Sequence, residues 1–373
     1  MSRLLPLLLL VLIPAPSTAL ADGCPPSQCG TTSSAVPGSR TLLVRPQGQQ
    51  GPLQAFDLVK GARRYALPAG MLSADGRAFV SSARAKAKRT TVARFDTRTG
   101  RLRRGWSLRG RWSVAGVSAN GRRVALVDYR KHAVALDVAG SRTVLRGMFE
   151  VEALSPDGRR VFLVHWRRNG YDLQQLDLST RKLSPTRLDE PDEKMSGTAV
   201  TALATRDGRW LLTLYAKGDG SFVHALDLRT GLAHCIDVPL RGDLFTVGST
   251  ALALSPDESS LYLASPYVGR VITVDLKRLE VKRVVRFRGV TTNTVDPSIG
   301  SSAAVTPNGR MLAFSGGTSV WLYDTAFGLV RRPIDVGSTM KGLGFGPGGR
   351  VLVAIRSSSD PIRLDAATGA RLH

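Results

Sequence analysis

Short apolar runs alternate with polar turns along almost the whole chain, and one turn sequence returns again and again. Its clearest copy is Leu154-Ser155-Pro156-Asp157-Gly158-Arg159, which lies between two apolar runs of strand length. Related turns recur at intervals of about 37 to 51 residues, and they begin at Leu72, Val117, Ala204, Leu254, Val305 and Phe345. Recurrence at this period indicates a repeat architecture made of short strands.

The chemistry of these turns predicts antiparallel hairpins. Proline sets φ near about −65°, Asp or Asn follows, and Gly takes the left-handed conformation that closes the hairpin. A second pattern then follows each turn, an apolar residue and Asp before a short turn that often contains Gly; residues 95–100, 226–231 and 364–369 are its clearest copies. We interpret this pattern as a third strand, a tight turn and a fourth strand. Four strands in a unit of about 45 residues predict the blade of a β-propeller, and therefore an all-β fold.

The number of blades depends on how the N-terminal part of the repeat region is read. Phe56-Asp57 begins an eighth copy of the second pattern, and Pro37-Gly38 marks a degenerate first turn before it. We therefore expect eight blades of four antiparallel strands over residues 33–373. Seven blades are the alternative, if the first and last segments combine into one blade that closes the ring. Beyond the N-terminus no helical apolar periodicity occurs, which argues against a parallel α/β fold.

The Ser-Pro-Asp-Gly-Arg units resemble the repeats of TolB-type, WD40-like bacterial propellers. Residues 254–287, with Leu261-Tyr262-Leu263-Ala264-Ser265 and Val271-Ile272-Thr273-Val274-Asp275, are similar to the repeats of YVTN-type propellers. The resemblance extends over about nine-tenths of the chain, but the motifs that carry it are structural. It implies the fold and leaves the function open.

The N-terminus has the features of a secretory signal peptide over residues 1–21: a basic residue, a short apolar centre and a small-residue cleavage site. We expect cleavage after Ala21 and a secreted or extracytoplasmic location in the cell envelope. Residues 22–32 then form a tail before the propeller. Cys24 and Cys29 lie close together in this tail, and in an oxidising compartment they predict a local disulfide.

The charge balance bears on the partner. The chain has 52 Lys and Arg against 29 Asp and Glu, a formal net charge of +23 at pH 7, which favours attraction to anionic surfaces. For an exported protein we expect the partner to be a protein or an anionic cell-envelope component, with peripheral attraction to a membrane surface. Nucleic acid is not expected, because aromatic residues are few and no nucleic-acid-binding motif occurs. The sequence leaves the oligomeric state open.

In a propeller, the loops between the second and third strands share one face with the connections from each fourth strand to the next blade. Cations and aromatic residues gather in four successive loops of the first kind, a combination that suits carboxylate or phosphate groups. We predict a binding site on this loop face, made of Arg84, Lys86, Lys88, Arg89, Tyr129, Arg130, Lys131, Trp166, Arg167, Arg168, Tyr215 and Lys217. The alternative is that loops of a very basic protein are basic without any ligand.

Signals for catalysis are weak. The sequence has no Gly-x-Ser-x-Gly elbow, no His-Glu-x-x-His and no phosphate-binding Gly loop, and its five His residues are scattered. No metal or cofactor is expected. The leading hypothesis is an exported, non-catalytic propeller that binds its partner through the loop face. The alternatives are a lactonase-like hydrolase with a site in the central channel, and a structural repeat protein without a specific ligand.

Overall fold

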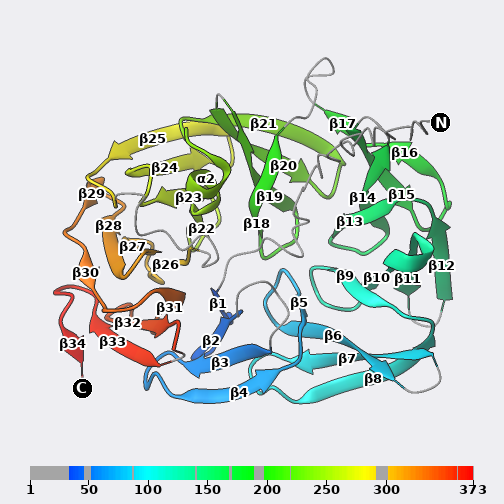
Figure 1. Ribbon diagram of the computed structural model, residues 1–373, viewed down its shortest axis with the longest axis horizontal. Helices are drawn as coiled ribbons and strands as arrows, with labels where there is room; N and C mark the ends of the chain where they lie inside the picture. The colour runs from blue at the N-terminus through cyan, green and yellow to red at the C-terminus, as the bar shows by residue number, and fades with distance from the viewer. Residues whose placement is uncertain are drawn as a thin grey trace, which may run out of the picture.

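The chain forms a closed ring of eight small β-sheets around a common axis (Figure 1). The computed structural model describes residues 33–45, 52–85, 88–138, 141–167, 170–188, 197–218, 220–290, 301–358 and 360–372. The predicted signal peptide, Cys24 and Cys29 lie outside these residues. No helix in the described ranges is long and apolar enough to cross a membrane.

The first four blades each contain four antiparallel strands that follow one another in sequence from the axis outward. Blade 1 contains β1 (Ser33–Ala35), β2 (Thr41–Val44), β3 (Leu53–Asp57) and β4 (Arg63–Leu67). Blade 2 contains β5 (Gly70–Leu72), β6 (Ala78–Ala85), β7 (Arg89–Asp96) and β8 (Leu102–Arg109). Blade 3 contains β9 (Ser113–Val117), β10 (Val124–Asp128), β11 (Ala133–Val138) and β12 (Ser141–Arg146), with the 3-10 turn η2 (Tyr129–Lys131) between β10 and β11. Blade 4 contains β13 (Phe149–Leu154), β14 (Arg160–Arg167), β15 (Gly170–Asp177) and β16 (Leu183–Pro185).

The last four blades repeat this plan with small additions. Blade 5 contains β18 (Thr198–Ala204), β19 (Trp210–Lys217), β20 (Gly220–Asp227) and β21 (Leu232–Val238), and the short β17 (Arg187–Leu188) pairs parallel to its outer strand. Helix α2 (Leu244–Gly248) leads to blade 6, which contains β22 (Ala251–Leu254), β23 (Ser260–Ser265), β24 (Arg270–Asp275) and β25 (Glu280–Arg286). Blade 7 contains β26 (Ala303–Val305), β27 (Met311–Gly316) and β28 (Ser319–Asp324), on which both β29 (Leu329–Val330) and β30 (Ile334–Asp335) pair. Blade 8 contains β31 (Met340–Phe345), β32 (Val351–Arg356), β33 (Pro361–Asp365) and β34 (Arg371–Leu372).

The ring closes without exchanging strands between its first and last blades. All four strands of blade 1 come from the N-terminal end of the repeat region, and all four of blade 8 come from the C-terminal end. Between them, the Ser33 hydroxyl donates to the carbonyl of Leu343 at 3.2 Å and accepts from the Leu343 N–H at 3.1 Å. The prediction of eight four-stranded blades is confirmed, and the seven-blade alternative, which required a shared blade, is wrong.

The recurrent turns have the conformation that their residues predict. In the first turn of blade 4, Gly158 has φ 69°, and the Asp157 carboxylate accepts from the Ser155 hydroxyl at 2.6 Å and from the Arg159 N–H at 2.9 Å. Blade 6 departs from the pattern, because Glu258 occupies the glycine position at φ 57°. Its carboxylate oxygens accept from the Arg206 N–H at 3.0 Å, so a contact with the neighbouring blade offsets the cost of this conformation.

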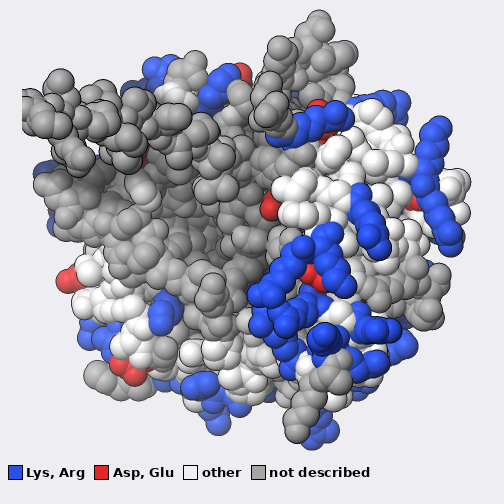
Figure 2. Space-filling view, turned by 45° about the vertical axis from the view of Figure 1, so that its right-hand side comes forward, with Lys and Arg blue, Asp and Glu red and all other residues white. Residues whose placement is uncertain are grey.

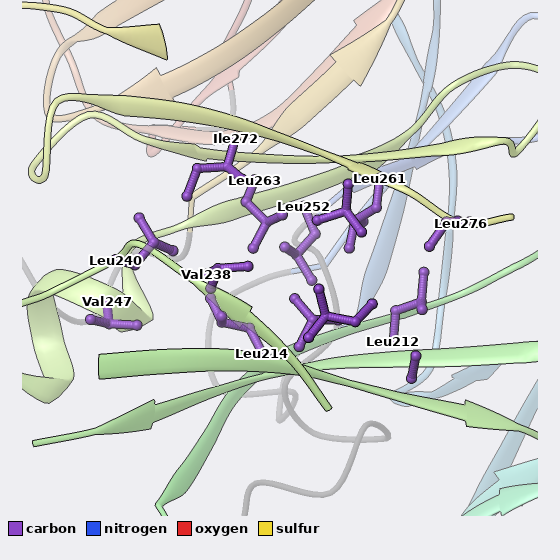
Figure 3. Close-up of a cluster of buried hydrophobic side chains, with 14 residues drawn as sticks. Leu212, Leu214, Val238, Leu240, Val247, Leu252, Leu261, Leu263, Ile272 and Leu276 are labelled. Atoms are coloured by element: carbon purple, nitrogen blue, oxygen red, sulfur yellow. The ribbon is translucent and has the colours of Figure 1, made fainter. Parts of the chain in front are cut away.

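The hydrophobic core lies between the faces of adjacent blades. The largest cluster joins blades 5 and 6, where Leu212, Leu214 and Ile272 are fully buried beside Leu252 (Figure 3). Burying one such side chain stabilises the fold by about 1.5–3 kcal/mol. Where neighbouring blades cover a middle strand on both sides, as in β10 and β19, its sequence reads as a nearly continuous apolar run.

Candidate functional site

The loop face brings together basic side chains from four connections on blades 2 and 3. Lys88 and Arg89 come from the β6–β7 turn, Arg109 and Arg111 from the connection between the blades, Arg130 and Lys131 from η2, and Arg146 from the end of β12. All seven side chains are exposed. Together with Trp112 we call these residues the blade 2–3 site. Figure 2 shows Lys and Arg gathered on the side of the ring that these blades form.

Trp112 fixes the centre of the blade 2–3 site. Its backbone N–H donates to the Thr90 hydroxyl at 2.9 Å, and its indole N–H donates to the carbonyl of Arg109 at 2.8 Å. Across the same connection, the N–H of Gly110 donates to the carbonyl of Lys88 at 2.8 Å. Trp112 is only 7% exposed, so its indole is a fixed apolar wall beside exposed cationic side chains.

A shallow pocket of about 500 Å³ opens beside this indole. Its walls are formed by Trp112, Lys131, Ala133, Val144 and Arg146. Two cations therefore flank an apolar floor, an arrangement that suits an anionic group attached to an apolar or ring-shaped body.

Among the described residues, the cations of the blade 2–3 site have no carboxylate partners. None of them forms an ion pair within the part of the chain that the structure describes. Asp128, the acidic residue next to η2, is 3% exposed and lies in the blade, beneath the surface. The positive charge of the site is therefore available to an anion.

Two of the turns in the site have left-handed backbone conformations at residues other than glycine. Lys88 has φ 56° and His132 has φ 44°. Such conformations cost free energy for residues with a side chain, and they concentrate at functional positions. In both turns a side chain is kept where glycine would relieve the strain.

The other predicted site residues are distributed over the loop face and the core. Arg84 is exposed at the end of β6, and Lys217 is exposed at the end of β19. Arg167 is exposed and pairs with Asp172. Tyr215 is 6% exposed, and its ring stacks on Phe222 at a centroid distance of 5.0 Å, which makes it a packing residue of blade 5.

Four predicted residues cannot be placed by their side chains. Lys86 and Arg168 lie outside the described residues, and for Tyr129 and Trp166 only the backbone is described, in η2 and β14. The structure adds Arg109, Arg111, Trp112 and Arg146, which the sequence analysis missed. The sequence could have indicated these four residues, because they lie at the connections between blades, which share the loop face.

A second concave feature is the axial cavity, about 860 Å³ in volume, which the first strands of all eight blades line. Most of its wall is apolar or small, including Leu72, Gly116, Ala202 and Leu254. Its ionisable groups are Arg40, Arg45, Glu152, Arg206 and Glu258. Arg206 and Glu258 form an ion pair of 3.5 Å at the mouth on the side of the recurrent turns.

The described wall of the axial cavity contains few groups suited to acid–base or metal chemistry. Among the described lining residues there are two carboxyl groups and no His or Cys. No group of three or more His, Cys, Asp or Glu that could hold a metal occurs in the described ranges. His224 is fully buried within blade 5, and His165 stacks on Phe149 at 4.4 Å.

Comparison with known proteins supports the architecture. No protein-family model and no curated sequence matches this chain. The solved structure of dihydro-heme d1 dehydrogenase NirN in complex with DHE is similar with a TM-score of 0.55 and 15% identity, over 91% of this chain and 74% of that one. The Dos1 propeller is similar with a TM-score of 0.55 and 11% identity, over 90% and 93% of the two chains. At these identities the likeness shows the fold alone, and the chain is a β-propeller.

Proposed function

We propose that this propeller binds an anionic polymer or surface of the cell envelope through the blade 2–3 site. The observation that carries the proposal is the set of seven exposed cations around a fixed indole, without carboxylate partners in the described residues. The signal peptide that we predict over residues 1–21 would place the protein outside the cytoplasm, where such partners occur. An acidic protein is the competing partner, and the experiment below distinguishes the two.

The arrangement of charge favours a repeating anion over a single small one. The cations lie along the joint between two blades, so neighbouring phosphate or carboxylate groups of one polymer can each meet a different side chain. Every contact between exposed groups contributes little, typically about 0.2–1 kcal/mol. Affinity therefore depends on many contacts formed at once, and salt must weaken it strongly.

The test compares two variants that lose the same charge at different places. The site variant carries Lys88→Gln, Arg109→Gln, Lys131→Gln and Arg146→Gln. The control variant carries Lys277→Gln, Lys282→Gln, Arg332→Gln and Arg371→Gln, which are exposed on blades 6 to 8. Calorimetry with sodium polyphosphate, and with polyglutamate as a carboxylate polymer, gives the dissociation constants at several salt concentrations.

We expect the site variant to bind polyphosphate at least about tenfold more weakly and with a smaller salt dependence, because four local contacts are lost. The control variant should lose no more than about threefold, from the reduced net charge alone. Equal losses in the two variants would show that only bulk charge acts, and would refute the site. Strong binding of polyglutamate without binding of polyphosphate would favour an acidic protein as the partner.

A further inference from the structure

Glu152 is a buried carboxyl group that lines the axial cavity. It lies in β13 at a β-bulge, where the pairing with β14 shifts register between Val151 and Ala153. Glu152 is 7% exposed, and its carboxyl group has no hydrogen-bond or ion-pair partner in the described part of the chain. A bulge of this kind re-aims one side chain of a strand, and here that side chain borders the cavity.

Arg45 is a second ionisable group in the same wall, and it has no partner among the residues that the structure describes. It directly follows β2, whose last residue Val44 pairs with Ser33 at the start of β1, so it lies at the loop-face end of the cavity. Arg45 is half-buried and forms no ion pair among the described residues. Of the other charged groups, Arg206 and Glu258 pair with one another, and Arg40 is exposed at the turn.

Burial disfavours the charged form of both groups. Burial raises the pKa of Glu152 to about 7, and it lowers the pKa of Arg45. Among the described residues, no charge of opposite sign shifts the pKa of either group in the other direction. A buried charge without a partner is costly. A ligand with an ammonium group and a carboxylate would remove this cost at Glu152 and would give the half-buried Arg45 a partner.

We propose that the axial cavity binds a small dipolar molecule with an ammonium group, which pairs with Glu152, and a carboxylate, which pairs with Arg45. The volume of about 860 Å³ lies within the range of small-molecule sites. The apolar part of the cavity wall, which includes Leu72 and Leu254, would contact the hydrocarbon body of such a ligand. The ligand class is that of amino acids and their longer ω-amino homologues.

The experiment uses probes that differ only in their charged ends and length. Glycine, 4-aminobutanoate, 6-aminohexanoate and 8-aminooctanoate carry both charges, whereas hexylamine and hexanoate carry one each. Calorimetry and thermal shift are measured on the unaltered protein and on Glu152→Gln and Arg45→Gln. Glu280→Gln and Arg371→Gln, both on exposed outer strands, are the matched controls.

We expect at least one dipolar probe to bind at least about tenfold more tightly than hexylamine and hexanoate, because it forms two charge-assisted contacts in place of one. Each cavity variant should abolish this advantage, and the controls should keep it. Absence of binding by every dipolar probe overturns the proposal, as does unchanged binding in Glu152→Gln or equal binding of hexanoate. The variant that removes four cations from the blade 2–3 site should bind these probes normally, so this test does not depend on the proposed function.

Discussion

Arg89 and Arg109 lie directly opposite each other in the β7–β8 ladder, and Arg94 and Arg104 form a second opposed pair in the same ladder. Arg89 is held in place by hydrogen bonds from its guanidinium to the Ser107 hydroxyl at 2.9 Å and to the Ser107 carbonyl at 3.1 Å. Like charges in directly opposed positions destabilise a sheet. Blade 2 therefore keeps a repulsion that an anion bound at the blade 2–3 site would relieve.

Arg109→Gln should stabilise the free protein while weakening anion binding. Loss of one opposed charge should raise the free energy of unfolding by about 0.2–1 kcal/mol at low salt, and salt should screen most of this gain. Urea denaturation at low and high NaCl measures it. Arg111→Gln removes the same charge outside the β7–β8 ladder. An equal rise in the free energy of unfolding of that variant would show that the lower net charge, and not the loss of the opposed pair, causes the stabilisation.

Gly208→Val should destabilise blade 5. Gly208 has φ 69°, and a Cβ atom there would lie 2.5 Å from Cβ of Ala119 in the turn of blade 3. A β-branched residue resists this conformation, and Ala119 has no flexible side chain that could move, so we expect a loss of about 2 kcal/mol or more. Thermal denaturation measures the loss.

Gly348→Val is the matched control for this turn. Gly348 occupies the position of Asp157 in the blade 8 turn, and no atom lies within 4 Å of a Cβ placed there. Its melting temperature should change little. A similar drop in both variants would mean that valine harms any of these turns, whatever the φ of the glycine.

The architecture could be predicted because its determinants are local. Turns such as 154–159 set the hairpins, and their number sets the number of blades. Turn residues cannot show how the ring closes, since the bonds between Ser33 and Leu343 join residues 310 positions apart. They also cannot show that Glu258 would take the left-handed position, because its support comes from Arg206 in another blade.

The candidate sites were less predictable because they depend on contacts between blades. Lys131 was predicted from its own loop. Trp112 and Arg146 line the same pocket only because consecutive connections pack together. Tyr215 was misleading, because β19 is buried on both faces and alternation cannot separate loop-facing from core-facing aromatics. Glu152 borders the cavity through a bulge, and a bulge is a property of strand register that apolar patterning does not reveal.

Ser33→Ala should weaken the closure of the ring. The substitution leaves the buried N–H and carbonyl of Leu343 without the hydroxyl that now bonds both, at a cost of about 1–3 kcal/mol. Ser34→Ala is the control, since Ser34 lines the cavity next to it. Hydrogen exchange should show the largest loss of protection in blades 1 and 8, and uniform loss over all blades would contradict the closure role.

Glu152 and His224 give the protein two opposed dependences of stability on pH. Burial raises the pKa of Glu152 in the folded protein from 4.5 to about 7. Its contribution to the free energy of unfolding is therefore complete below about pH 4.5 and is lost as the pH rises through 7. Burial lowers the pKa of His224 from 6.5 to about 4, and neither ring nitrogen has a hydrogen-bond partner in the described structure. Its contribution is complete above about pH 6.5 and is lost as pH falls through 4. Each shift corresponds to about 3 kcal/mol.

The pH ranges over which Glu152 and His224 change the stability overlap, and the two effects have opposite signs. The unaltered protein should therefore show little change in stability between about pH 5 and 6.5. A variant that lacks one of the two groups should show the pH dependence caused by the other. Glu152→Gln should become more stable with rising pH and should exceed the unaltered protein at pH 8 by up to about 3 kcal/mol. His224→Phe, which keeps a ring beside Tyr215, should instead become less stable as pH rises to 7. Urea midpoints from pH 5 to 8 measure these profiles. Parallel profiles for Glu152→Gln and the unaltered protein would mean that the carboxyl group titrates normally, and that the axial cavity imposes no cost that a ligand could remove.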